Sequence, residues 1–352
     1  MDAFFELIQI GIGKKNSLVR KILPDEWEFI FELALRHGVC GIVFDGIKFS
    51  HEQGSILNIN FNLKMDWIGL THEIETLNRQ HEATMKKLGR KLSEYGYKMM
   101  ILKGYGLSQN YPIPDHRTSG DLDIWCFGLE KEVDKIIEAQ GLDVDNSHHH
   151  HSVFRFEEES VENHFDFINI YTRPSAKRVE RKLKELAYKG YSEKDGLYYP
   201  SADFNAIFLL RHCASHFAPT EMTVKQVMDW GFFMEKHHQE INWSEYVPFI
   251  KKEGMSRFYN LLGLFCVREL GFEESIFHGL YYDDLYERFK AEVVTPEFQK
   301  RESGSLIRAM WIKPTRWWHN RWKSHLCYPD SLVSTFIYNI WGKLLKPTHF
   351  VQ

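Results

Sequence analysis

Hydrophobic positions follow a helical spacing at both ends of the chain and a different spacing in its middle. In residues 25–39 and 70–97, apolar side chains recur three and four positions apart, as they do on one face of an α-helix. The same spacing returns after Ser201, a residue type that often caps the first turn of a helix. The pattern therefore predicts a helical region over residues 1–90 and a helical domain over residues 201–352.

Short apolar runs replace the helical spacing between residues 91 and 200. Bounded by glycine or polar residues, such runs indicate β-strands, and they occur at KMMIL (98–102), DLDIWCF (121–127), HSVFRFE (151–157) and VENHFDFINIY (161–171). The last two runs flank a polar turn and predict a hairpin, while EKEVDKIIEAQG (130–141) predicts a helix. We therefore expect an α+β fold in which a small mixed sheet, within a core at 91–200, is flanked by helical regions.

Composition narrows the class of protein. A chain of 352 residues is long enough for two or three domains, and its net charge of −4 gives no global sign of nucleic-acid binding. Five scattered cysteines without a CxxC pair favour reduced thiols and argue against a zinc site. We find no apolar run long enough to predict a membrane span, and we expect a cytoplasmic protein.

Two acidic residues lie in the apolar run at 121–127. An extended strand places Asp121 and Asp123 on one face, roughly 7 Å apart, because side chains alternate between the two faces. Carboxylates at this spacing repel each other, and burying them unpaired is costly. A divalent cation removes that repulsion, and hard oxygen ligands suit Mg²⁺. The alternative is a solvent-facing strand with two exposed acids.

A glycine-bearing turn precedes these acids. A predicted strand ends at Lys103 and Gly104, and YGLSQNY (105–111) is a candidate for the start of a helix. Glycine allows a phosphate to approach the backbone closely, and a helix N-terminus offers unpaired amides. The turn and the two aspartates together indicate a site for a phosphate group and a metal ion.

A third acid is available on the later strand candidate. Glu162, His164 and Asp166 share one face of the predicted strand, while the apolar residues share the other. A neighbouring strand with this pattern would complete a site of three carboxylates. Either Glu162 or Asp166 can fill the third position, and we favour Asp166 because its neighbours are apolar. The alternative is a hairpin with one wet face.

The stretch LKGYGLSQNYPIPDHRTSGDLDI (102–124) resembles the nucleotidyltransferase superfamily with the DNA-polymerase-beta-type fold. More narrowly, the chain is similar to the bacterial group of uncharacterised nucleotidyltransferases. Three other stretches carry this narrower resemblance, and they are WEFIFELALRHGVCGIVFDGI (27–47), VENHFDF (161–167) and FLLRHCASHF (208–217) with VKQVMDWGFFM (224–234).

The resemblance implies a metal-dependent transfer of a nucleoside monophosphate from a nucleoside triphosphate (NTP) to a hydroxyl of an acceptor, with Mg²⁺ or Mn²⁺ as cofactor. Asp121, Asp123 and Asp166 would be the catalytic and metal-binding acids, with Glu162 as the alternative third acid. The triphosphate would be bound at the glycine turn and at the arginine and serine before the acids, which are Lys103, Gly104, Tyr105, Arg117 and Ser119.

Several histidines are further candidates. His212 and His216 are four residues apart on a predicted helix, so they face the same way, and the resemblance implies that they line the active-site cleft together with His164 and Asp229. The run His148–His151 precedes a predicted strand in mid-chain, where one of its histidines could lie near the nucleotide.

Two other functions compete with the enzyme. Tyr105 follows Gly104 where the superfamily usually has serine or glycine, which favours a nucleotide-binding or partner-binding module without turnover. An aromatic and basic segment at 307–329 keeps open a toxin–antitoxin-type enzyme that modifies RNA or protein. The sequence leaves the acceptor (a small molecule, a protein or RNA) and the oligomeric state open.

Overall fold

The N-terminal quarter of the chain is helical, as the periodicity predicts. The computed structural model describes residues 1–295 and 316–345. Helix α2 ends where Gly38 adopts a left-handed conformation with φ of 65°, which glycine adopts without strain. The helices of this region are α1 (Asp2–Gly11), α2 (Glu26–His37), α3 (Cys40–Glu52) and α4 (Phe61–Glu94).

Seven strands of the described residues form one mixed sheet in the middle of the chain, in the order β3-β4-β5-β2-β1-β7-β6. The predicted hairpin is confirmed, since β4 and β5 pair antiparallel around a turn in which Glu157 and Glu158 both have positive φ. The strands are β1 (Met100–Ile101), β2 (Leu122–Trp125), β3 (Val144–Asp145), β4 (His151–Phe156), β5 (Glu159–His164), β6 (Tyr191–Lys194) and β7 (Leu197–Pro200).

The pairing of β2 with β5 decides where the acidic residues meet. These two strands run parallel, and their register places Asp123 beside Glu162. On the other side of β2, strand β1 pairs antiparallel, and the amide of Leu102 donates to the carbonyl of Asp123 at 3.1 Å. The strand that carries Asp123 is therefore central in the sheet, with both edges paired.

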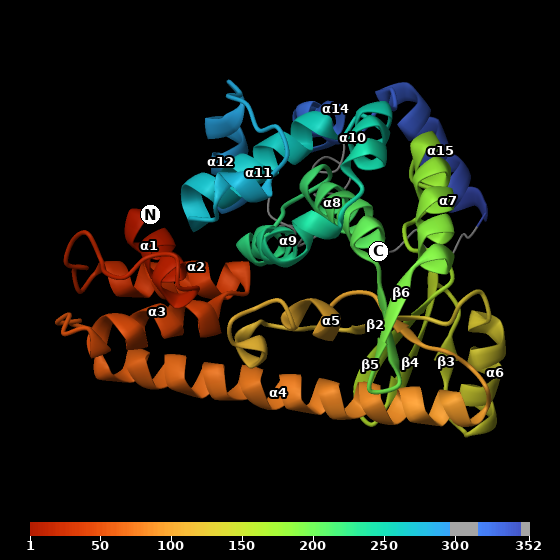
Figure 1. Ribbon diagram of the computed structural model, residues 1–352, viewed down its shortest axis with the longest axis horizontal. Coiled ribbons are helices and arrows are strands. Elements are labelled where there is room, and N and C mark those ends of the chain that lie inside the picture. The colour runs from red at the N-terminus through yellow and green to blue at the C-terminus, as the bar shows by residue number, and fades with distance from the viewer. Residues whose placement is uncertain (296–315, 346–352) are drawn as a thin grey trace, which may run out of the picture.

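The two faces of the sheet have different partners. Leu122 and Ile124 point into an apolar cluster with Leu88 of α4 and with Val133 of helix α6 (Glu130–Ala139). Asp123 and Trp125 alternate with them and face the opposite way, where Trp125 joins the larger cluster that also contains helices α7 and α8. Figure 1 shows α4 running along the base of the molecule, beneath both the N-terminal helices and the sheet. The acidic face of the sheet therefore looks toward the C-terminal half of the chain.

Helices cover that acidic face. The predicted cap at Ser201 is confirmed, because its side chain accepts a hydrogen bond from the amide of Phe204 at 3.3 Å. Helix α15 lies alongside α7 (Figure 1). The helices of this half are α7 (Pro174–Lys189), α8 (Ala202–Phe217), α9 (Val224–His237), α10 (Trp243–Lys252), α11 (Ser256–Leu270), α12 (Tyr286–Val294), α14 (Arg321–Cys327) and α15 (Leu332–Leu345).

The α+β class is confirmed, with the mixed sheet between helical regions as expected. The larger apolar cluster draws side chains from all three predicted regions, for example Phe4, Trp125 and Phe208. The regions at 1–90, 91–200 and 201–352 therefore share one core, and their division into domains stays a prediction. All five cysteines are buried as free thiols. Within the described ranges, no helix is both long and apolar enough to cross a membrane.

Candidate active site

A cavity of about 960 Å³ lies between the acidic face of the sheet and the helices that cover it. Its wall combines side chains from the end of β1, from strands β4 and β5, from the start of α7, and from α8 and the C-terminal helices. The cavity is in the size range of pockets for small molecules and cofactors. Three of the candidate residues, Lys103, Glu162 and His164, line it on the sheet side, whereas the predicted acids Asp121, Asp123 and Asp166 are not among its lining residues.

Asp123 is the centre of the polar cluster on this wall. Its side chain is buried, and its Oδ1 accepts from the Nζ of Lys103 at 2.8 Å and from the Nε2 of His164 at 2.9 Å. Lys103 follows β1 and His164 ends β5, so both neighbours of β2 contribute a hydrogen-bond donor to this carboxylate. The carboxylate that the sequence singled out is therefore held by two charge-assisted hydrogen bonds.

Glu162 completes this cluster. Its Oε2 lies 3.3 Å from the Nε2 of His164, and its Oε1 lies 3.7 Å from the Nε2 of His151. The ligand atoms of Asp123, Glu162 and His164 all lie within 4.8 Å of one another. With 22% of its side chain exposed, Glu162 can still reach a ligand in the cavity. Two carboxylates and one imidazole thus converge at one point of the sheet.

Neighbouring groups in the cluster shift one another's pKa values. Burial would raise the pKa of Asp123, but the charge of Lys103 and the hydrogen bond from His164 hold it well below its usual range. Burial alone would lower the pKa values of Lys103 and His164, and their contacts with the carboxylates outweigh that effect and raise both. Asp123 is therefore ionised, and its charge is balanced within the protein.

Asp121 and Asp166, the other two predicted acids, lie outside this cluster. Asp121 is exposed and precedes the first residue of β2. Strand β5 ends at His164, so the alternation that would align Asp166 with Glu162 stops before reaching it. The Asp166 carboxylate pairs with the Nζ of Lys184 on α7 at 2.7 Å. The geometry thus favours Glu162 over Asp166 as the partner of Asp123.

The histidine run meets the cluster from strand β4. His150, His151 and His164 offer ring nitrogens within 4.8 Å of one another. Burial lowers the pKa of His150 to about 2 and that of His151 to about 4, so both imidazoles are neutral near pH 7. Of the run that the sequence singled out, these two residues line the cavity.

Helix α8 contributes the opposite wall. His212 and His216 both line the cavity, and their ring centroids are 4.7 Å apart. Burial, together with the charge of Lys103, lowers the pKa of His212 well below its usual value, so its imidazole is neutral. The i, i+4 spacing read from the sequence therefore brings this pair to the same cavity as Lys103 and Glu162.

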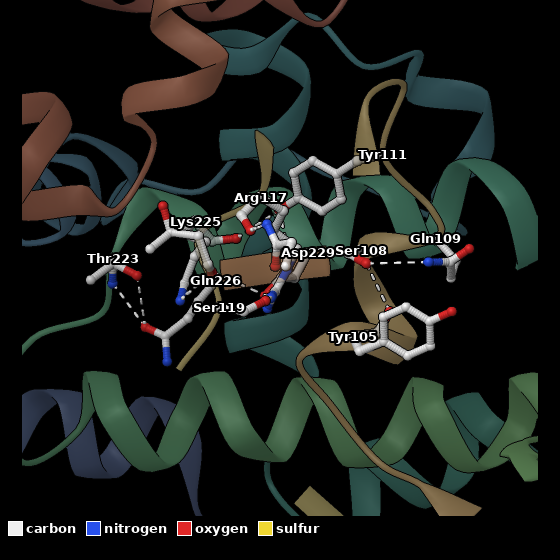
Figure 2. Close-up of polar contacts among 12 residues, drawn as sticks. Tyr105, Ser108, Gln109, Tyr111, Arg117, Ser119, Thr223, Lys225, Gln226 and Asp229 are labelled. Atoms are coloured by element: carbon white, nitrogen blue, oxygen red, sulfur yellow. Dashed lines mark hydrogen bonds and ion pairs between the residues drawn. The ribbon is translucent and has the colours of Figure 1, made fainter. Parts of the chain in front are cut away.

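Arg117, Ser119 and Asp229 form a separate buried network, shown in Figure 2. The Nε and Nη2 of Arg117 donate to Oδ1 and Oδ2 of Asp229 at 2.6 and 2.8 Å, and its Nη1 donates to Ser119 at 3.2 Å. The hydroxyl of Tyr111 donates to Oδ1 of the same aspartate at 2.7 Å. This network fastens the segment before β2 to helix α9, which gives the arginine and the serine of the motif a structural task.

Lys225 lies beside this network (Figure 2). Its Nζ donates to the carbonyl of Thr118 at 3.2 Å. Burial, and then the charge of Arg117, lowers the pKa of Lys225 to about 8. The segment before β2 is therefore held to α9 by a second contact.

The turn at Gly104 is held by hydrogen bonds within its own backbone. Gly104 has φ of 55° and ψ of −113°, a conformation that favours glycine, and it precedes the four-residue helix α5 (Tyr105–Ser108). The amides of Leu107 and Ser108 return to the Gly104 carbonyl at 3.2 and 3.1 Å. Tyr105 packs against the apolar cluster of α4 and the sheet, away from the acidic face.

A comparison with models of protein families shows to which family the chain belongs. The model of a family described as uncharacterised nucleotidyltransferase matches residues 24–271, which include the sheet, the acidic cluster and helices α8 and α9. The chain belongs to this family of nucleotidyltransferases. No curated protein and no solved structure matches it.

Membership of this nucleotidyltransferase family supports the general class of reaction that the motif predicted. The cavity is also lined by several residues that the sequence analysis did not predict as site residues, among them Arg173 and Arg211. One signal was available, since Arg211 interrupts the apolar run IFLLRHC, where a charged residue needs a reason. Arg173 precedes Pro174 and carried no comparable signal.

Replacing Gly104 with valine tests the turn of this nucleotidyltransferase. A β-branched residue does not adopt its backbone angles, and a Cβ there would lie 3.4 Å from the Asp121 carbonyl. We expect a loss of about 1–3 kcal/mol in the free energy of unfolding and a larger loss of triphosphate affinity. Urea denaturation and titration calorimetry on one sample measure both quantities.

Gly141→Val is the matched control for the turn. Gly141 also has positive φ, at 80°, and a Cβ there meets nothing within 4 Å. It should lose a similar amount of stability and no triphosphate affinity. A Gly104→Val protein that binds triphosphate as tightly as the parent contradicts a role of this turn in nucleotide binding.

Proposed function

We propose that the protein transfers a nucleoside monophosphate from an NTP to a hydroxyl group of an acceptor in a metal-dependent reaction. The observation that carries this proposal is the pairing of Asp123 with Glu162 on adjacent parallel strands, beside a cavity of about 960 Å³. Two carboxylates at one point of a sheet, in a chain of this family, are what a metal-dependent phosphoryl-transfer site requires.

The donor set fits a divalent cation. Asp123 and Glu162 supply carboxylate oxygens and His164 an imidazole nitrogen, all within 4.8 Å of one another. Carboxylate oxygens suit Mg²⁺ and Mn²⁺, and the nitrogen is acceptable to Mn²⁺. Bound there by Asp123 and Glu162, such an ion would neutralise phosphate charge and align the reacting groups.

Lys103 and His164 have a role before and during nucleotide binding. Without ligand they balance the charge of Asp123, through contacts of 2.8 and 2.9 Å. With a divalent cation held by Asp123 and Glu162, the ammonium of Lys103 would be available to a phosphate oxygen in the cavity that it lines. Lys103 would thus stabilise the negative charge that collects on the departing pyrophosphate.

A base is also present for the acceptor. In the reaction, the bond from the α-phosphorus to pyrophosphate breaks, a bond to the acceptor oxygen forms, and the hydroxyl proton must be accepted. His212 faces the cavity as a neutral imidazole, because burial and the charge of Lys103 lower its pKa. We assign His212 the task of accepting that proton or orienting the hydroxyl that loses it.

A second candidate function is nucleotide binding without turnover. Asp123 already accepts hydrogen bonds from Lys103 and His164, so its carboxylate has partners without a metal ion. A protein of this kind would bind NTP through Lys103 and release it unchanged. The choice between the two functions therefore depends on whether Mg²⁺ strengthens NTP binding and on whether label is transferred.

Thermal unfolding with each of the four NTPs, with and without Mg²⁺, tests the proposal. A ligand at about a hundred times its Kd stabilises the folded state by about 2.7 kcal/mol, so at least one NTP should raise the melting temperature, and more so with Mg²⁺. Incubation of an α-labelled NTP with cell extract then asks whether label enters an acceptor. Binding that ignores Mg²⁺, with no transfer of label, would favour the second candidate.

A further inference from the structure

The wall of the cavity is unbalanced in charge. Of the described residues that line it, four are lysine or arginine, and Glu162 is the one carboxylate. The whole chain has a net charge of −4, so this excess of positive charge is local. Lys103 is compensated by Asp123, whereas the arginines lie elsewhere on the wall. The basic members of the lining are Lys103, Arg173, Arg211 and Arg316.

Two of these arginines stack on one aromatic ring. The Cζ of Arg173 lies 3.2 Å from the centroid of the Tyr328 ring, and the Cζ of Arg211 lies 4.2 Å from it. Tyr328 is 5% exposed and Arg211 is 4% exposed, so the ring and one guanidinium are nearly excluded from water. The ring fixes both side chains, but a tyrosine face does not neutralise two positive charges.

Three buried donor nitrogens of these two arginines lack acceptors among the described residues. Among the described residues, no hydrogen-bond acceptor serves the buried Nε and Nη1 of Arg211 or the buried Nη1 of Arg173. Other arginines of this protein bind carboxylates with two parallel hydrogen bonds, as Arg178 does with Glu253 at 2.9 Å in each. Buried donors without acceptors cost free energy, and buried charges cost more.

Asp330 is the nearby acid, but its hydrogen bonds go to another residue. Asp330 is close enough to raise the pKa of Arg211, but its carboxylate accepts hydrogen bonds from the amide and the hydroxyl of Ser175 at the start of α7. Burial and the charge of Arg173 together lower the pKa of Arg211. Two adjacent cations are thus held at the cavity, and three of their buried donor nitrogens have no hydrogen-bond acceptor among the described residues.

We propose that Arg173 and Arg211 form a subsite for a phosphate-class anion of the substrate. Guanidinium groups bind phosphate through paired N–H donors, and the planar fork of arginine suits its tetrahedral oxygens. The subsite deepens the proposed transferase function, on which its assignment to a substrate rests. The anion is either the triphosphate tail of the donor or a phosphate carried by the acceptor.

Calorimetric titration with inorganic tripolyphosphate, in the absence of metal ions, tests the subsite directly. We expect the parent protein to bind, and Arg211→Met to bind at least about tenfold more weakly, as for one lost charge-assisted contact. Arg173→Gln should weaken binding by a similar factor. A parent that does not bind tripolyphosphate, or an Arg211→Met protein that binds it equally well, overturns the proposal.

The melting temperature separates a binding role from a structural one. Methionine fills similar space without a charge, so Arg211→Met should melt at or above the temperature of the parent. Arg268 is the matched control, because its Cζ lies 4.5 Å from the ring of the buried Tyr286, while the arginine itself is exposed and lies outside the cavity lining. Arg268→Met should bind tripolyphosphate like the parent. If Arg211→Met fails to fold, the less buried Arg173→Gln decides the question.

Competition identifies the source of the anion. If the subsite binds the tail of the donor, tripolyphosphate and NTP exclude each other. If it binds a phosphate of the acceptor, NTP with Mg²⁺ binds to the protein already saturated with tripolyphosphate. Tripolyphosphate binding that depends on both arginines, in a protein without Mg²⁺-dependent NTP binding, keeps the subsite and rejects the proposed transferase.

Discussion

Replacing Asp123 with asparagine is expected to abolish the stabilisation that Mg²⁺ and NTP give together. The carboxylate is the partner of both Lys103 and His164, at 2.8 and 2.9 Å, and it is 5% exposed. Asparagine leaves the ammonium of Lys103 without a negative charge beside it and His164 without its carboxylate acceptor, so we also expect a loss of about 1–3 kcal/mol in the free energy of unfolding. Urea denaturation measures the stability, and thermal unfolding with NTP and Mg²⁺ measures the binding.

Three further variants separate the loss of a metal ligand from the loss of a fold. Glu162→Gln removes the second carboxylate at a side chain that is 22% exposed, and it should lose Mg²⁺-dependent binding with little change in stability. Asp166→Asn and Asp121→Asn remove acids that lie outside the cluster, and both variants should retain Mg²⁺-dependent NTP binding. Undiminished Mg²⁺–NTP binding in Glu162→Gln, with loss of binding in Asp166→Asn, would return the third position to Asp166.

Replacing Arg117 with alanine is expected to destabilise the protein by about 3–5 kcal/mol. The change leaves the Asp229 carboxylate buried, with only the Tyr111 hydroxyl and Lys225 nearby to compensate it. It also releases the segment before β2 from helix α9. Urea denaturation of the variant beside the parent measures the loss.

This variant also decides between two roles for the same residue. If Arg117 served the nucleotide and not the fold, the variant would retain its stability and lose affinity for NTP. Arg155→Ala is the control for an exposed ion pair, since the side chains of Arg155 and Glu158 are 73% and 95% exposed, and it should change stability by no more than about 1 kcal/mol. Replacing Arg117 and Asp229 together by apolar residues should cost less than Arg117→Ala alone.

The sequence was sufficient for four of the seven strands, β1, β2, β4 and β5, and for the central acid, whereas β3, β6 and β7 were not predicted. Alternation in a short apolar run placed Asp123 on the polar face of a strand, and the structure has it there, beside Lys103. The i, i+4 histidines of helix α8 were equally local, and both line the cavity. These predictions depended on periods of two and 3.6 residues, which the backbone imposes within one element.

What the sequence could not supply was the pairing between elements. Glu162 and Asp166 look alike along the chain, and the difference is that β5 ends at His164 and lies parallel to β2 in a register that aligns Glu162 with Asp123. Arg117 and Asp229 are 112 positions apart, so their ion pair is set by tertiary packing. The stack of Arg173, Arg211 and Tyr328 depends in the same way on three distant segments.

The number of residues in the middle of helix α4 is constrained by contacts at its two ends. Its 34 residues extend about 50 Å at a rise of 1.5 Å each. Trp67 near its start packs with the N-terminal helices, whereas Met85 and Leu92 near its end pack under the sheet. One residue inserted between these two contacts would turn one of them by about 100° around the helix axis relative to the other. Insertions and deletions in relatives should therefore fall in the loops at either end of this helix and spare its middle.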